Sequence, residues 1–380
     1  MPILCLPLLV ALAVPLSDEL SSPPRGPMER TEPQVHEALF EVTLHAMTSR
    51  HRDRTMDLPR MELSNTQIMM PLITRGPYST IDTNKATMRL WLQNREVEGL
   101  SKRTKLDPEG MMGGALLIAP VDRFQGTLLR WNLTIPIQVW SSKLDDRAAA
   151  QLRWPAEWPE AVHSALAPQA YIESDDPIFA KAVETATENR LRLMPPLLAA
   201  KELIRFAITK MQVSEPATEL GGVREIKGMK ITGAKYAGEK GMGTPHDLVC
   251  VCVAMLRAGG IPARPVIGIY KHPLTEQIEL VSWAELYLHG AGWIPFDPVQ
   301  MQRNGVFGRN LIDPWPDFGT LPLHNQRIPL AYYFIPPREA EVSVWPAIWG
   351  WHPPAAKNIE IGQTIRLDTR FIRVGADEPR

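Results

Sequence analysis

The segment from residue 241 to residue 264, GMGTPHDLVCVCVAMLRAGGIPAR, constrains the fold more than any other part of the chain. Thr244 is a natural helix N-cap, Pro245 suits the first helical position, and Asp247 completes a capping box. The helix that begins here is apolar on nearly every face until Gly259 and Gly260 end it. A helix of this kind is buried. We therefore predict a central helix, packed on a sheet built from the three runs that follow, RPVIGIY, IELVSWAELYL and GWIPF.

The rest of the chain supplies a second, strand-rich part. The 380 residues are enough for about two domains. Short alternating or apolar runs between residues 35 and 150, separated by Gly, Pro and Asp, predict an antiparallel β-sandwich. Helical periodicity starts at Asp176, and a second helix after Pro196 has one apolar stripe. We expect an α+β fold class with three parts: a β-rich domain at 35–150, an α+β domain at 151–300, and a Pro- and Trp-rich extension at 301–380 packed on the core.

Charge and hydropathy limit the partners. The chain has 41 Lys and Arg against 42 Asp and Glu, a net charge of −1, and no long basic run, so we expect no nucleic-acid partner. We predict no transmembrane span, because no stretch of about 20 apolar residues occurs.

The first 16 residues have the length and apolar character of a signal peptide, with Ala11 and Ala13 as a cleavage motif. No Lys or Arg precedes the apolar run and Pro7 interrupts it, so an incorrectly assigned start or a buried strand remains an alternative. A cleaved signal implies a secreted or periplasmic protein, and an uncleaved one a cytoplasmic protein. Residues 17–34, rich in Ser, Pro and charge, are predicted to be a linker.

The cysteines and histidines do not predict a metal site. Cys5, Cys250 and Cys252 cannot build a disulfide framework, and His272 and His289 form no metal-ligand spacing with them. We expect neither a metal nor another cofactor.

Several motifs, in their order along the chain, resemble those of the transglutaminase-like family within the papain-like cysteine enzyme superfamily. Members of that family have a glycine-rich approach, Cys-x-Asp at the start of a buried helix, GIPAR, a His-Ala-Trp-x-Glu strand and a W-x-P-F-D-P end. The resemblance covers residues 241–298, and the matching residues here are Gly241, Gly243, Asp247, Gly260 to Arg264, Trp283, Glu285 and Trp293 to Pro298.

The resemblance also places three catalytic positions. The nucleophile position holds Pro245 and the general-base position holds Val281, so only the third position, Asp297, keeps the family's residue. Pro245 has no nucleophile and Val281 cannot transfer a proton. We therefore expect a pseudoenzyme with a binding or scaffolding role, and an Asp-Pro turn as the structural function of Asp297.

The vestigial cleft is expected to contain four further residues. His246 and Asp247 lie beside the nucleophile position, and Trp283 and Glu285 follow the base position. The simplest expectations are an exposed first-turn histidine at His246 and a buried hydrogen bond or ion pair at Glu285.

Two enzymatic alternatives remain open at this stage. If the register differs, Cys250 or Cys252 becomes the nucleophile of a thiol-dependent amide hydrolase or transamidase, although core packing is the usual role of such thiols. Cys252 would lie about two helical turns deeper than Pro245. The other alternative is acid–base chemistry built on His246, Asp247 and Asp297.

The tail contains four tryptophans amid prolines. They are either a packing strap over the core or an aromatic platform for a glycan, a peptide or a partner protein. These residues are Trp315, Trp345, Trp349 and Trp351.

Overall fold

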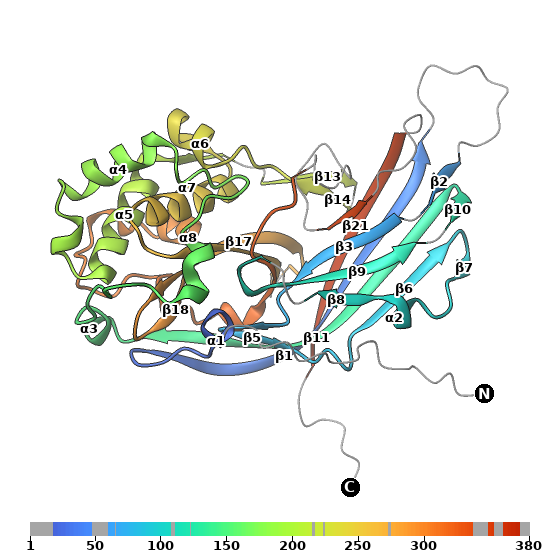
Figure 1. Cartoon of the computed structure of the whole chain (residues 1–380), viewed down its shortest axis with the longest axis horizontal. Helices are drawn as coiled ribbons and strands as arrows, with labels where there is room; N and C mark the ends of the chain where they lie inside the picture. The colour runs from blue at the N-terminus through green and yellow to red at the C-terminus, as the bar shows by residue number, and fades with distance from the viewer. Residues whose placement is uncertain are drawn as a thin grey trace, which may run out of the picture.

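The computed structural model describes residues 18–47, 60–64, 66–107, 111–121, 123–214, 217–222, 225–272, 275–336, 349–352 and 360–372. The predicted signal segment, residues 1–16, lies outside this part of the chain. The described part has a helical end and a strand-rich end, and two long strands, β1 (Met28–Met47) and β11 (Leu128–Leu144), run from one end to the other (Figure 1).

The strand-rich end is built on β1, which pairs with β11 on one side and with β21 (Glu360–Ile372) on the other, both antiparallel. The full order of this sheet is β13-β14-β21-β1-β11-β5-β4, and β6 also pairs with β11 and with β7. The remaining members are β4 (Arg75–Gly76), β5 (Ser79–Ile81), β6 (Thr87–Leu92), β7 (Arg95–Glu96), β13 (Thr218–Gly222) and β14 (Glu225–Met229).

A second antiparallel sheet faces the first. Its order is β20-β3-β9-β8, with β3 (Thr66–Leu72), β8 (Lys105–Asp107), β9 (Ala115–Val121) and β20 (Gly350–His352). The ring of Trp131 on β11 lies 5.4 Å from Phe40 on β1 and 5.8 Å from Trp349, which precedes β20. All three side chains are buried, so the core of the predicted sandwich lies between the two sheets and the fold class is confirmed.

Short elements complete this part of the chain. They are α1 (Asp18–Ser21), β2 (Met61–Leu63), α2 (Leu100–Arg103), η1 (Met111–Gly113) and β10 (Phe124–Gly126), and β2 pairs with β10.

The helical end is built around α7 (Pro245–Ala258), in which the residues from His246 to Arg257 are all buried. Thr244 and Asp247 form the predicted capping box. The helices α4, α5, α6 and α8 contact α7, and the predicted central helix is confirmed. Their bounds, with the shorter elements of this region, are α3 (Asp146–Ala149), η2 (Glu160–Ala165), α4 (Pro177–Thr187), η3 (Leu191–Leu193), α5 (Pro196–Lys210), α6 (Ala234–Lys240) and α8 (Pro298–Arg303).

One antiparallel sheet packs against α7, in the order β18-β17-β16-β19. The first three strands are those expected from the sequence, β16 (Ala263–Lys271), β17 (Ile278–Leu288) and β18 (Gly292–Phe296). The fourth, β19 (Arg327–Ala331), comes from the segment predicted as an extension. A small parallel pair, β12 (Gln212–Val213) with β15 (Met242–Gly243), leads into α7.

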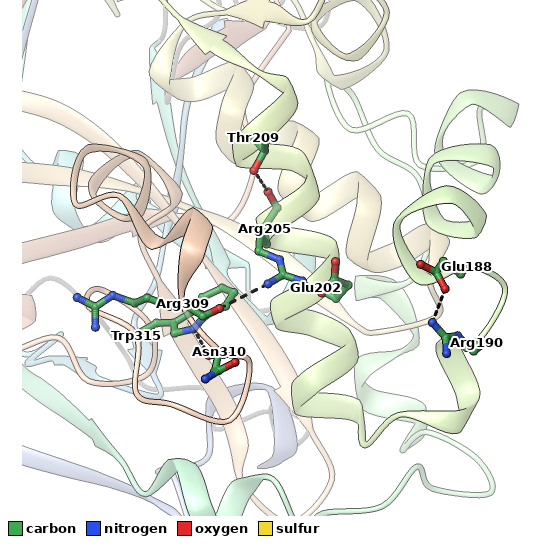
Figure 2. A network of polar contacts seen from close by, with 8 residues as sticks. All are labelled: Glu188, Arg190, Glu202, Arg205, Thr209, Arg309, Asn310 and Trp315. Carbon is green, nitrogen blue, oxygen red and sulfur yellow. Dashed lines mark hydrogen bonds and ion pairs between the residues drawn. The ribbon is translucent and has the colours of Figure 1, made fainter.

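The segment after α8 is hydrogen-bonded to α5 (Figure 2). Arg205 of α5 donates a hydrogen bond of 3.5 Å to the carbonyl of Arg309, and the indole of Trp315 donates one of 2.8 Å to the carbonyl of Asn310. This segment also contains η4 (Val306–Gly308) and η5 (His324–Gln326). Trp315 and Trp349 are buried, as a packing strap requires. Trp345 lies outside the described residues.

Segments from all three predicted parts interleave. β13 and β14, from the helical half of the sequence, and β21, from the end of the chain, belong to the same sheet as β1. Paired strand structure already begins at Met28, inside the predicted linker. The domain boundaries at residues 35, 150 and 300 stay predictions.

Candidate functional site

The side chain of Asp247 connects the loop before α7 to the first turn of that helix. Its carboxylate accepts backbone hydrogen bonds from Thr232 at 2.7 Å, from Gly233 at 3.0 Å and from Thr244 at 2.9 Å. The side chain is fully buried. Since these donors occupy both carboxylate oxygens, Asp247 fixes the loop before α7 to the helix start.

His246 is buried, so the expectation of an exposed first-turn histidine is wrong. Its side chain lies between α7 and β17, where Nδ1 is 2.8 Å from the hydroxyl of Ser282, and the ring of Phe334 lies 6.1 Å away. Burial lowers the pKa of His246 to about 4, an effect that the backbone of Ala217 partly offsets. The imidazole is therefore neutral at neutral pH.

Val281 faces away from this contact. It packs against a cluster formed by Ile73, Met112, Val266, Trp283 and Tyr332, of which the first two come from the strand-rich end. Successive residues of a strand point to opposite faces of the sheet. Ser282 therefore meets α7, whereas Val281 and Trp283 face the strand-rich end.

Asp297 is engaged by an arginine. Its carboxylate lies 2.7 Å from Nη2 of Arg327 on β19 and accepts hydrogen bonds of 3.0 Å from the backbone of Val299 and of Gln300. The side chain is the N-cap of α8. The sequence analysis missed Arg327, because it arrives thirty residues later on another strand and no local motif accompanies it.

Glu285 forms the expected buried ion pair. Its carboxylate accepts from Nε of Arg264 at 2.9 Å and lies 2.8 Å from Nη2, and Nη1 donates to the carbonyl of Met112 at 2.8 Å. The guanidinium lies 3.8 Å and 3.7 Å from the ring centres of Trp293 and Tyr332. Burial raises the pKa of Glu285, and Arg264 opposes that rise. This group links β16, β17 and η1.

His324 is a second buried histidine that the sequence analysis missed. Its ring lies 5.5 Å from Trp283 and 5.2 Å from Tyr78. Burial, and then the charge of Arg327, lower the pKa of His324 to about 3. Asp297, Arg327, His324 and Trp283 thus form one buried group between the sheet of the helical end and the strand-rich end.

Cys250 and Cys252 are free thiols on α7 and are fully buried. Burial is the largest cause that raises the pKa of each thiol. In the described ranges, no group of three or more His, Cys, Asp and Glu residues could hold a metal ion. No helix there is long and apolar enough to cross a membrane.

The sequence and the fold were compared with known proteins. Residues 185–298 match the family model of the transglutaminase-like superfamily. The search of curated proteins gave no match.

The comparison with solved structures matched this chain to three crystal structures, of which the first supports a likeness of fold. A protein from Cytophaga hutchinsonii described as a candidate cysteine protease is 13% identical, with a TM-score of 0.51, over 91% of this chain and 100% of that one. The periplasmic domain of TgpA from Pseudomonas aeruginosa is 16% identical, with a TM-score of 0.32, over 73% of this chain and 91% of that domain. A candidate protease from Parabacteroides distasonis is 9% identical, with a TM-score of 0.23, over 69% of this chain and 47% of that one.

The family match begins within α4 and ends at the first residue of α8. It contains α7 and the three strands that pack on it, together with every residue at the three catalytic positions. The chain therefore contains a transglutaminase-like domain, and residues 185–298 are the part of the chain that matches the family model.

Proposed function

We propose that the transglutaminase-like domain is catalytically inactive and that the protein acts by binding or scaffolding. The observation that supports this most is the ion pair between Asp297 and Arg327. In the family pattern, the acidic residue orients an imidazole. Here its carboxylate is bound to a guanidinium and to the backbone of α8.

The residue types at the three positions cannot perform the family's chemistry. Pro245 offers no nucleophile and also removes a backbone N–H from the helix N-terminus. Val281 cannot accept a proton. A guanidinium has hydrogen-bond donors but no acceptor, so Arg327 cannot replace the imidazole as a general base.

The cysteine-enzyme alternative has less support. The thiolate is the nucleophilic form, and burial that raises the pKa of Cys250 and Cys252 suppresses it at neutral pH. Both side chains are also inaccessible to an amide substrate in this conformation.

The acid–base alternative is weakened by the geometry. His246 is bonded to Ser282, and among the described residues no hydrogen bond joins it to Asp247 or Asp297. The carboxylates are engaged by backbone N–H groups, and in the case of Asp297 by Arg327 as well.

Native alkylation tests the proposal against the cysteine enzyme. A Cys5→Ser variant, which leaves only Cys250 and Cys252, is treated with iodoacetamide at pH 7.5 and followed by mass spectrometry. We expect no labelling of the native protein over a time that labels a urea-denatured sample completely. Rapid labelling of one native thiol, with turnover of an amide substrate that is abolished by its substitution with Ala, would overturn the proposal.

The partner is proposed to be a protein, a peptide or a glycan, and the protein to be exported. Export depends on cleavage of the signal segment at residues 1–16. Intact-mass measurement on protein purified from the producing cells tests this, because cleavage after Ala13 removes 13 residues, whereas an uncleaved chain keeps them.

A further inference from the structure

A groove of about 360 Å³ opens between α4, α5, α6 and α7. Its volume falls in the range of sites for small organic ligands. The site around Asp297 is separate, since neither Asp297 nor any of its partners lines the groove. We call it the helical groove, and the residues that line it include Phe179, Phe206, Lys210, Gly238, Val251 and Met255.

The floor of the helical groove is apolar. Val251 and Met255 of α7, Phe179 of α4 and Met211 after α5 are all buried, and Phe206 is half-buried. A hydrocarbon chain placed on this floor would leave water at a gain of about 0.8 kcal/mol for each methylene buried.

Gly238 keeps the groove open. A Cβ atom at this position would lie 3.5 Å from Ile178 and 3.6 Å from Phe179, which is ordinary van der Waals contact. Its φ lies outside the left-handed region, so the backbone does not require glycine. Glycine within a helix costs about 1 kcal/mol relative to alanine. Neither the backbone conformation nor steric crowding therefore requires glycine at position 238. The space that a side chain would fill there is part of the groove.

Two lysines make the rim of the groove positive. The ammonium groups of Lys210 and Lys240 lie 5.7 Å and 5.8 Å from the ring centres of Phe206 and Tyr236, and both lysines are exposed. Within the described ranges, neither lysine forms an ion pair with a carboxylate. Glu239 is the one acidic residue among those lining the groove. The rim thus keeps a net positive charge beside an apolar floor.

We infer that the helical groove binds a small amphipathic carboxylate, with its hydrocarbon chain on Val251 and Met255 and its carboxylate at Lys210 and Lys240. The apolar floor accounts for the chain and the lysines for the anionic head. This inference is independent of the proposed inactivity of the domain, because it uses no residue near Asp297.

Methyl NMR on protein labelled with ¹³C at the methionine methyl groups tests the site directly. Sodium decanoate, used below its micelle concentration, should shift the signals of Met211 and Met255 in a saturable way and leave that of Met301, buried on α8, in place. Unchanged spectra, or shifts confined to methionines elsewhere, would refute the inference.

Variants separate the floor from the rim. Gly238→Trp should fill the groove and weaken decanoate binding at least tenfold, whereas Gly308→Trp, its matched control at an exposed glycine of η4 outside the groove, should retain binding. Lys210→Gln combined with Lys240→Gln should weaken binding about tenfold. If decanol bound as tightly as decanoate, or if Gly238→Trp bound normally, the assigned ligand class or the assigned place would be wrong.

Discussion

The guanidinium of Arg327 lies 2.7 Å from the carboxylate of Asp297, and both side chains are largely buried. Asp297 belongs to the region that matches the family model, whereas Arg327 lies on β19, beyond the end of that match. A later segment of the same chain therefore adds the fourth strand to the sheet beside α7 and supplies the cation that pairs with Asp297.

Replacing Arg327 should destabilise the protein. In Arg327→Met, the carboxylate of Asp297 stays buried without its cation, and breaking a buried pair from one side costs about 3 kcal/mol. Urea unfolding at pH 7 measures the loss. The matched control is Arg370→Met, which removes an arginine from an exposed pair with Glu37 and should cost less than about 1 kcal/mol. Equal losses in the two variants would show that the Asp297–Arg327 pair contributes no more to stability than the exposed pair does.

The buried pair of Arg264 and Glu285 should show strong coupling. Each single variant, Arg264→Met or Glu285→Leu, leaves one charge buried, and we expect losses of about 3–5 kcal/mol. The double variant removes both charges and should lose less than the sum of the single losses. A double-mutant cycle in urea gives the interaction energy directly. Additive losses would mean that the two side chains act independently, contrary to their 2.8–2.9 Å contacts.

Acid should destabilise the protein through His246. Its pKa is lowered from 6.5 to about 4 in the folded protein, so between these values the unfolded chain binds more protons. The stabilisation is fully present above pH 6.5 and is lost as the pH falls towards 4. Integration from pH 7 to pH 5 gives a loss of about 2 kcal/mol from this residue alone.

The comparison of wild type with His246→Gln isolates this effect, because other titrating groups remain in both proteins. Between pH 7 and pH 5, the free energy of unfolding should fall by about 2 kcal/mol more in the wild type than in His246→Gln. An equal pH dependence in wild type and His246→Gln would contradict the burial of His246.

Local signals explain which features the sequence could predict. The capping box of Thr244 and Asp247, the three strands after α7 and the burial of Cys250 and Cys252 follow from residues close together in the chain. The partner of Asp297 and the burial of His246 do not, since they depend on β19 and on Phe334. The pairing of β21 with β1 likewise joins segments more than 300 residues apart, and no periodicity within either strand identifies its partner.

A cysteine at position 245 should be more reactive than an ordinary thiol. Pro245 is the first residue of α7 and is half-buried, so a thiol there would lie at a helix N-terminus, where the dipole and free N–H groups favour the thiolate. In Pro245→Cys, we expect the rate of alkylation against pH to give a thiol pKa below about 8.5, the value of an ordinary cysteine. Cys250 and Cys252 should remain unlabelled in the same native sample.

The matched control is Thr209→Cys, near the C-terminus of α5, where the dipole opposes a negative charge. Its pH–rate profile should give a thiol pKa at or above about 8.5. Because the pKa is read from the midpoint of each profile, the comparison does not depend on how accessibility scales the absolute alkylation rate at each site. A lowered pKa at position 245 alone would show that the N-terminus of α7 can activate a thiol, so that the proposed inactivity would follow from the residue type at position 245. Equal pKa values at the two sites would instead mean that the surroundings of the α7 N-terminus do not activate a thiol. The proposed inactivity would then not depend on Pro245 alone.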